Sequence, residues 1–335
     1  MSKAPLIDFR SFLAIAVFGI IVFFAVGCSS SSEAETKPSE IRLDYAYYSP
    51  TSLVLKKFGW AEEAFAEEDI DVSWTLSQGS NKAIEFLNSD SVDFGSTAGA
   101  AALIAESNGV PLENVYVYSQ PEWTALVTKE GSGIETIEDL KGKKVAATLG
   151  TDPYIFLVRA LDSVGMTVND IELVNLQHAD GGNALVNGDV DAWAGLDPHM
   201  AKHELESNTQ LFFRDINLNT YGFLNVREEF AEAHPEYVEQ VIELYEKARQ
   251  WILDNPEEAA ELLAEEADIS VDVAKVQLVE RTDFSNPVPG QQHIDAISAA
   301  GEILKQADAI NKDADIEALT NELINPEYAE TVIEQ

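Results

Sequence analysis

The sequence predicts an α/β protein made of two lobes built on one plan. Between residue 41 and about residue 220, apolar stretches of strand length alternate with amphipathic helical stretches, and polar loops follow the strands. One pattern of helix, turn and strand occurs twice, at 83–94 and at 184–193. The strand reads Val-Asp-Phe in the first copy and Val-Asp-Ala-Trp in the second. Two such lobes would face each other across a cleft lined by strand-end loops.

The first lobe begins with a βαβαβ pattern, which predicts a mostly parallel sheet covered by helices. The expected strands and apolar runs are at 41–45, 70–76, 92–95, 115–118 and 124–128, and the expected helices are at 53–65, 83–88 and 100–105.

The second lobe is expected to start from the buried strand at 145–149, which Gly150 ends. A helix follows, with Thr151 or Asp152 at its N-cap and Pro153 in its first turn, where proline is tolerated. A strand that enters a helix through a glycine turn directs backbone amides into a crevice. The turn therefore indicates either a site for a small polar or anionic ligand or an ordinary βα connection.

The rest of the second lobe repeats this order, with a strand at 171–176, a loop at 177–183, a helix from 184 and a strand at 190–193. From Tyr221 one more strand leads into mostly helical sequence. We expect lobe 1 to comprise 41–128 plus 217–335 and lobe 2 to comprise 129–216, with the C-terminal helices covering lobe 1.

The chain is strongly acidic, with a formal net charge of −38 over 335 residues. A field of this sign repels nucleic acids and anionic membrane surfaces, so neither is expected as a partner. The acidity indicates a solvated surface and carries little information about the fold.

The N-terminus has the features of an export signal. Lys3 and Arg10 precede an apolar run at 12–27, which is short for a membrane span. This run leads through Ala-Val-Gly to Cys28, the single cysteine, and so resembles a bacterial lipoprotein signal. We expect a signal peptide at 1–27, lipid on Cys28, a flexible tether at 28–40 and an extracytoplasmic protein anchored to the cell membrane. An uncleaved signal anchor is the alternative.

Catalytic and metal-binding motifs are weak in this sequence. It has no nucleophile elbow, P-loop or dinucleotide fingerprint. His199 and His203 are four residues apart and could share one helical face, but no third ligand is evident, and a surface helix is the favoured reading. We therefore expect no enzymatic activity, metal or cofactor.

Polar and aromatic residues at strand ends and helix starts form the predicted ligand site. Their hydroxyls and amides would hold a polar head, and their rings an apolar body. The candidates are Tyr48, Ser49, Gln78, Ser80, Ser96, Thr97, Glu122, Trp123, Thr151, Asp152, Tyr154 and Asp197.

Seven segments together carry a family resemblance: 47–51, 77–81, 92–99, 139–145, 188–193, 197–198 and 234–238. Through them the chain resembles the substrate-binding lipoproteins of bacterial importers for aliphatic sulfonates, taurine and nitrate. The resemblance implies a type 2 periplasmic-binding fold whose lobes close on one small molecule. It also implies delivery to an ABC permease and its ATPase by a monomeric receptor, with the ligand's acidic head at Ser96, Thr97 and Thr151.

The charge pattern departs from a simple anion site. Asp152, Glu122 and Asp197 are near the expected cleft, and no Lys or Arg lies in these loops. A ligand that also carries an amine, like taurine, would suit both ends. Three alternatives remain: a receptor for a thiamine-precursor pyrimidine or another heterocycle, a pyrimidine-forming enzyme, whose Cys- and His-rich motifs are absent here, and an extracellular sensor domain.

Overall fold

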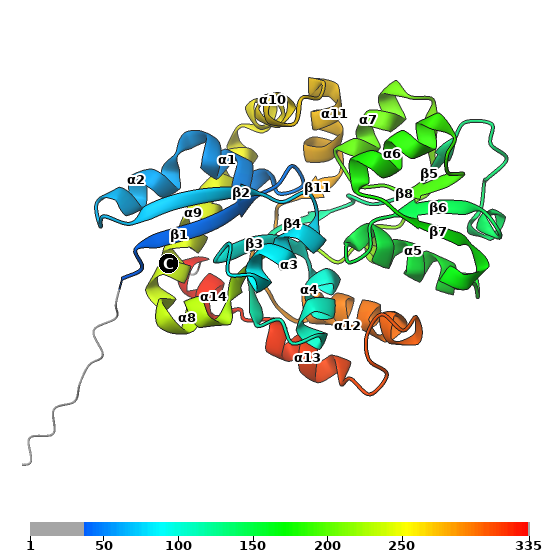
Figure 1. Cartoon of the computed structure of the whole chain (residues 1–335). Coiled ribbons are helices and arrows are strands. Elements are labelled where there is room, and N and C mark those ends of the chain that lie inside the picture. Colours follow the sequence, from blue (N-terminus) through cyan, green and yellow to red (C-terminus); the bar gives the residue numbers. More distant parts are fainter. Residues whose placement is uncertain (1–36, 334–335) are drawn as a thin grey trace, which may run out of the picture. The chain divides into compact units, whose positions relative to one another are not determined.

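Two β-sheets organise the chain in a computed structural model that describes residues 37–333 (Figure 1). The expected signal peptide at 1–27, Cys28 and the tether as far as residue 36 lie outside the described residues. Within 37–333, no helix has both the length and the hydropathy needed to cross a bilayer.

The first sheet is built around β1, which pairs in parallel with β2 and β3, so that Leu43 lies opposite Trp74 on one side and Phe94 on the other. β10 continues the sheet by pairing antiparallel with both β3 and β4. Across the sheet the order is β11 (Thr282–Asp283), β4 (Leu112–Pro121), β10 (Gly222–Arg227), β3 (Phe94–Ala98), β1 (Glu40–Tyr45) and β2 (Asp71–Leu76).

The second sheet has β6 pairing in parallel with β7 and β8, while β5 pairs antiparallel with β8 and β9. Across the sheet the order is β7 (Glu172–Asn175), β6 (Lys144–Ala147), β8 (Ala192–Ala194), β5 (Leu126–Lys129) and β9 (Thr209–Phe213).

Both sheets are mixed, but most strands of each run in one direction, as predicted. The antiparallel strands are β10 and β11 in the first sheet and β5 in the second. The chain leaves the first sheet after β4 and enters the second as β5, and it returns from β9 into β10. Each entering strand starts at the edge where its parallel neighbours end, and it therefore runs opposite to them. β5 belongs to the second sheet, although residues 126–128 were expected in lobe 1.

Helices cover both sheets, and two of the predictions for them are wrong by more than a few residues at an end. Gly59, at φ 65°, adopts the left-handed conformation and divides the expected helix at 53–65 in two. The expected loop at 177–183 is instead the first part of α6, which begins at His178. The helices before β10 are α1 (Pro50–Phe58), α2 (Trp60–Ala66), α3 (Ser80–Asn88), α4 (Gly99–Ser107), α5 (Asp152–Ser163), α6 (His178–Asn187) and α7 (His199–Glu206), with short 3₁₀ turns at Ile137–Leu140, Val168–Asp170 and Ile216–Leu218.

The helices after β10 cover mainly the first sheet, as predicted (Figure 1). They are α8 (Glu228–Ala233), α9 (Pro235–Asp254), α10 (Pro256–Ala267), α11 (Val271–Lys275) with the π-helix Val276–Glu280, α12 (Gln291–Gln306), α13 (Ile316–Leu323) and α14 (Glu327–Ile333).

Each sheet has its own hydrophobic core. In the first lobe, Phe94 and Phe223 belong to one buried cluster with Tyr245 of α9, in which Phe94 packs against Phe230 and Tyr245 against Tyr116. In the second, Val145 of β6 packs with Phe156 of α5 on one face, and Trp193 lies in a cluster on the other. The predicted class of two α/β lobes is confirmed, and each lobe presents its own loops at the boundary between them.

Candidate functional site

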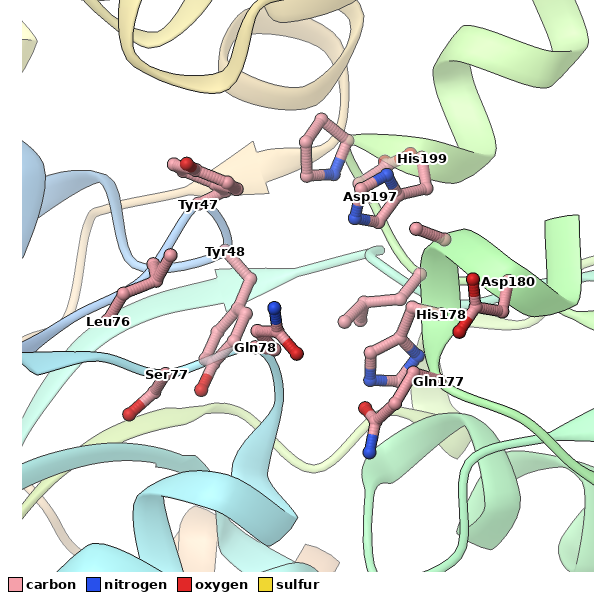
Figure 2. A pocket seen from close by; sticks show the side chains of 13 residues that line it. Tyr47, Tyr48, Leu76, Ser77, Gln78, Gln177, His178, Asp180, Asp197 and His199 are labelled. Carbon is pink, nitrogen blue, oxygen red and sulfur yellow. The ribbon is translucent and has the colours of Figure 1, made fainter. Parts of the chain in front are cut away.

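A cavity of about 290 Å³ lies between the two lobes. The first lobe contributes the loops after β1 and β2, and the second contributes the starts of α6 and α7 (Figure 2). Its lining residues are Tyr47, Tyr48, Leu76, Ser77, Gln78, Gln177, His178, Ala179, Asp180, Leu196, Asp197, Pro198 and His199. A smaller pocket of about 10 Å³ shares Tyr48, His178 and Leu196 with it.

Several helices begin at these two cavities. α6 and α7 start with His178 and His199 in the larger one, and Ser80 and Asp152 start α3 and α5 in the smaller one. The first N–H groups of a helix have no acceptor within it, and they lie at the positive end of its dipole. Helix starts from both lobes therefore supply donors suited to an anion.

The larger cavity also has an apolar side. Tyr47, Tyr48 and Leu76 line it from the first lobe, and Leu196 and Pro198 from the second. The ring of Tyr48 is fixed because its hydroxyl donates to the carbonyl of Ser96 at 3.0 Å, and its edge contacts Trp123 with ring centroids 5.9 Å apart. The cavity can therefore hold a short apolar body beside a polar head.

The carboxylate of Asp197 is buried at the cavity and has a cationic partner. Arg281, 84 residues away in the chain, places Nη1 3.2 Å from each of its oxygens, and the N–H of Ala201 donates at 2.8 Å. Burial raises the pKa of Asp197 to about 6, against the opposing effect of Arg281. Arg281 also pairs with Glu204. The predicted loops contain no Lys or Arg. The cation that pairs with Asp197 is Arg281, which lies directly before β11 and reaches Asp197 only in the folded chain.

His178 was not predicted as a site residue. Its side chain is 2% exposed, and Nδ1 lies 3.1 Å from Oγ1 of Thr148. Burial, reinforced by the nearby His199, lowers the pKa of His178 to about 3. The imidazole is therefore neutral at neutral pH.

The sequence places His199 and His203 four residues apart. Both lie on α7, but residues 37–333 contain no cluster of three or more His, Cys, Asp or Glu side chains able to hold a metal ion. The favoured prediction of a surface helix holds only in part, because His203 is 8% exposed and its ring makes a T-shaped contact with Trp193.

The twelve predicted residues divide into three groups. Three line the larger cavity: Tyr48, Gln78 and Asp197. Four others line the smaller pocket: Ser80, Trp123, Thr151 and Asp152. The five that line neither are Ser49, Ser96, Thr97, Glu122 and Tyr154.

Ser96 and Thr97 are buried because β3 runs on to Ala98 instead of ending at Gly95. The N–H and hydroxyl of Ser96 donate to Asp44 at 2.9 Å, and Oγ1 of Thr97 accepts from Asn225 at 2.8 Å. Both hydroxyls thus hydrogen-bond within the first lobe, and neither residue lines either pocket. Anion contacts at Ser96 and Thr97 stay a prediction.

Three other predicted residues have partners within the protein. Ser49 Oγ lies 3.2 Å from Ser96 Oγ, and Glu122 forms two 2.8 Å hydrogen bonds with Arg214. Tyr154 packs against the second-lobe core.

Asp152 does not cap its own helix. Its carboxylate accepts from Nε1 of Trp123 at 2.8 Å and from the N–H and hydroxyl of Thr220 at 3.1 and 2.7 Å. The side chain is 2% exposed, and burial raises its pKa against these hydrogen bonds. Asp152 joins the second lobe to both crossing segments, and three of its acceptor positions are used within the protein.

Position at the end of a strand was the signal that could have identified further residues that line the larger cavity. Tyr47, Ser77 and Gln177 adjoin residues or loops already marked at strand ends, and Leu196 and Pro198 flank Asp197. The start of α6 was missed because His-Ala-Asp-Gly-Gly-Asn has the composition of a loop.

The fold is that of the periplasmic binding proteins. The crystal structure of the periplasmic aliphatic sulphonate binding protein SsuA from Escherichia coli matches with a TM-score of 0.74 and 26% identity, covering 87% of this chain and 93% of that one. The sequence matches the model of the NMT1/THI5 like family over residues 59–259, and the chain belongs to this family.

Two curated relatives cover much of the chain. The putative aliphatic sulfonates-binding protein of Escherichia coli (strain K12) is 30% identical over 259 residues, which is 76% of this chain and 79% of that protein. The protein of the same description from Bacillus subtilis (strain 168) is 27% identical over 308 residues, 90% of this chain and 92% of the relative.

Proposed function

We propose that this protein is the extracytoplasmic receptor of an ABC importer for small aliphatic or taurine-like sulfonates. The observation that carries the proposal is the cavity between the lobes, where helix starts that favour an anion meet an apolar wall. The names of the two curated relatives support the same ligand class. The receptor would capture the sulfonate and deliver it to the permease and its ATPase.

The two lobes would capture the ligand by closing on it. Lobe 1 would comprise residues from 41 to the start of β5 together with 217–335, and lobe 2 the residues from β5 to 216. Two crossing segments and a main hydrophobic core around each sheet support this division. Among the buried side chains that the structure describes, apolar contact between the lobes is limited to Ile155 and Leu196 in the first cluster and to a small cluster of Ala201, Val273 and Val276. Lipid on Cys28 and a tether to residue 40 would keep a monomeric receptor at the membrane.

Calorimetry with ethanesulfonate, butanesulfonate and taurine tests the proposal. We expect dissociation constants in roughly the micromolar range, about −8 kcal/mol. Carboxylates of the same length serve as the matched control and should bind more weakly. Binding of a thiamine-precursor pyrimidine in place of every sulfonate, or no sulfonate affinity better than about 1 mM, would reject the proposal.

Gly79→Ala is expected to weaken sulfonate binding about tenfold. A Cβ at Gly79 would lie 2.7 Å from Nε2 of His178 and 2.9 Å from Oδ1 of Asn81, so the lobes would have to separate there. The measurement is calorimetry, with Gly290→Ala as the control because no atom lies within 4 Å of its Cβ position. Equal affinities for the two variants would show that close approach at Gly79 is not required.

A further inference from the structure

We propose that the cleft selects sulfonates that also carry a hydrogen-bond donor, a hydroxyl or an amino group, and that Nε2 of His178 accepts this hydrogen bond. The inference rests on the proposed function and specifies the ligand class within it.

Hydrogen bonding fixes the tautomer of His178. The single hydroxyl proton of Thr148 is donated to the carbonyl of Leu176, at 2.7 Å between Oγ1 and O. Thr148 can therefore only accept from Nδ1 of His178, 3.1 Å away. In the neutral ring the proton is then on Nδ1, and Nε2 has a lone pair.

This Nε2 is buried and has no hydrogen-bond partner among the described residues. It lies where the lobes meet, against Gly79 of the first lobe, and His178 lines both the larger cavity and the smaller pocket. Figure 2 shows His178 and Gln177 on one side of the cavity and Tyr48 and Gln78 on the other. A buried acceptor without a donor is costly, so a donor from the ligand would be favourable here.

Two other atoms strengthen the need for a donor. Oε1 of Gln177 and Oδ1 of Asn81 are also buried without a partner, and Asn81 adjoins Gly79. Two acidic groups that were predicted near an amine already have hydrogen-bond donors within the protein. Trp123 and Thr220 donate to Asp152. Arg281 and Ala201 donate to Asp197.

A neutral imidazole lone pair repels sulfonate oxygens, which are themselves acceptors. The anionic head would therefore lie at the helix starts, and the donor end of the ligand would face His178. Asp180 lines the same cavity and adds attraction for an amine.

Three sulfonates of equal chain length test this arrangement: ethanesulfonate, 2-hydroxyethanesulfonate and taurine. By calorimetry, the wild-type protein should bind the hydroxyl and amino ligands at least about tenfold more tightly than ethanesulfonate. In His178→Leu this preference should fall to within about twofold, whatever the change in the affinity for ethanesulfonate itself.

The ¹⁵N NMR spectrum of the wild-type protein provides a readout that does not depend on the variant. It should show His178 protonated at Nδ1 and unprotonated at Nε2 at pH 7. Equal binding of the three ligands, a preference that persists in His178→Leu, or a proton on Nε2 would overturn this inference alone. Binding of none of the three would overturn the proposed function as well.

Discussion

Asp152→Ala is expected to lower the free energy of unfolding by about 4 kcal/mol. The carboxylate accepts three hydrogen bonds from Trp123 and Thr220, and its removal leaves these donors buried without a partner. Chemical denaturation should show the loss, together with a fall in melting temperature of about 10 °C.

Asp162→Ala is the matched control, because Asp162 lies on the same helix, α5, but is exposed. This variant should change stability by less than about 0.5 kcal/mol. Asp152→Asn should fall between the two, since the amide keeps one acceptor oxygen but places an NH₂ group against a donor. Equal stability of Asp152→Ala and Asp162→Ala would mean that the Asp152 hydrogen bonds do not hold the crossing segments.

Arg281→Met is expected to cost about 3–5 kcal/mol. Arg281 is 5% exposed and pairs with Asp197, whose side chain is fully buried, so the variant leaves a carboxylate without its cation. Arg281 comes from the first lobe and Asp197 from the second, so sulfonate affinity should fall too. The control is Arg214→Met. The side chain of Arg214 is 46% exposed, so its ion pair with Glu122 should contribute less than about 1 kcal/mol to the free energy of unfolding.

The effect of Arg281→Met should depend on pH in a defined direction. The pKa of Asp197 is about 6 in the folded protein, above its ordinary value of 3.8. The folded state therefore binds more protons than the unfolded state between about pH 4 and 6, and stability falls as the pH rises through this window. Without Arg281 the pKa should rise further, so the variant should lose less stability at pH 5 than at pH 8. Removing the buried charge as well, in Arg281→Met/Asp197→Asn, should restore the stability that Arg281→Met loses at pH 8. An equal loss of stability at pH 5 and pH 8, or a double variant that does not regain stability, would contradict this explanation.

Much of the fold follows from local sequence signals. The alternation of strands and helices, and the two-lobe plan, could be predicted from the spacing of apolar residues. Each helix or strand buries one face, and the apolar residues of that face recur at the period of the element. The antiparallel direction of β5 and β10 could not be predicted, because both have the sequence of ordinary apolar strands and only their connections reverse them.

The candidate site was predicted less completely. Tyr48, Gln78 and Asp197 were found because they follow strands, and strand ends meet at the cleft. Ser96 and Thr97 were placed there by the same rule, but β3 extends past them. A shift of three residues in the end of β3 moves these side chains from the cleft to the interior, and sequence patterns do not define strand ends so closely.

The sequence by itself determined that Gly150-Thr151-Asp152-Pro153 turns from a strand into a helix at the boundary between two lobes, because glycine, an N-cap residue and proline each favour that local geometry. Only the tertiary structure decided what these residues do there. Asp152 bonds to Trp123 and Thr220, and Asp197 to Arg281, because long-range packing selects a buried carboxylate's partners. Among the unpaired buried acceptors at the cleft is Nε2 of His178, which only folding brings against Gly79.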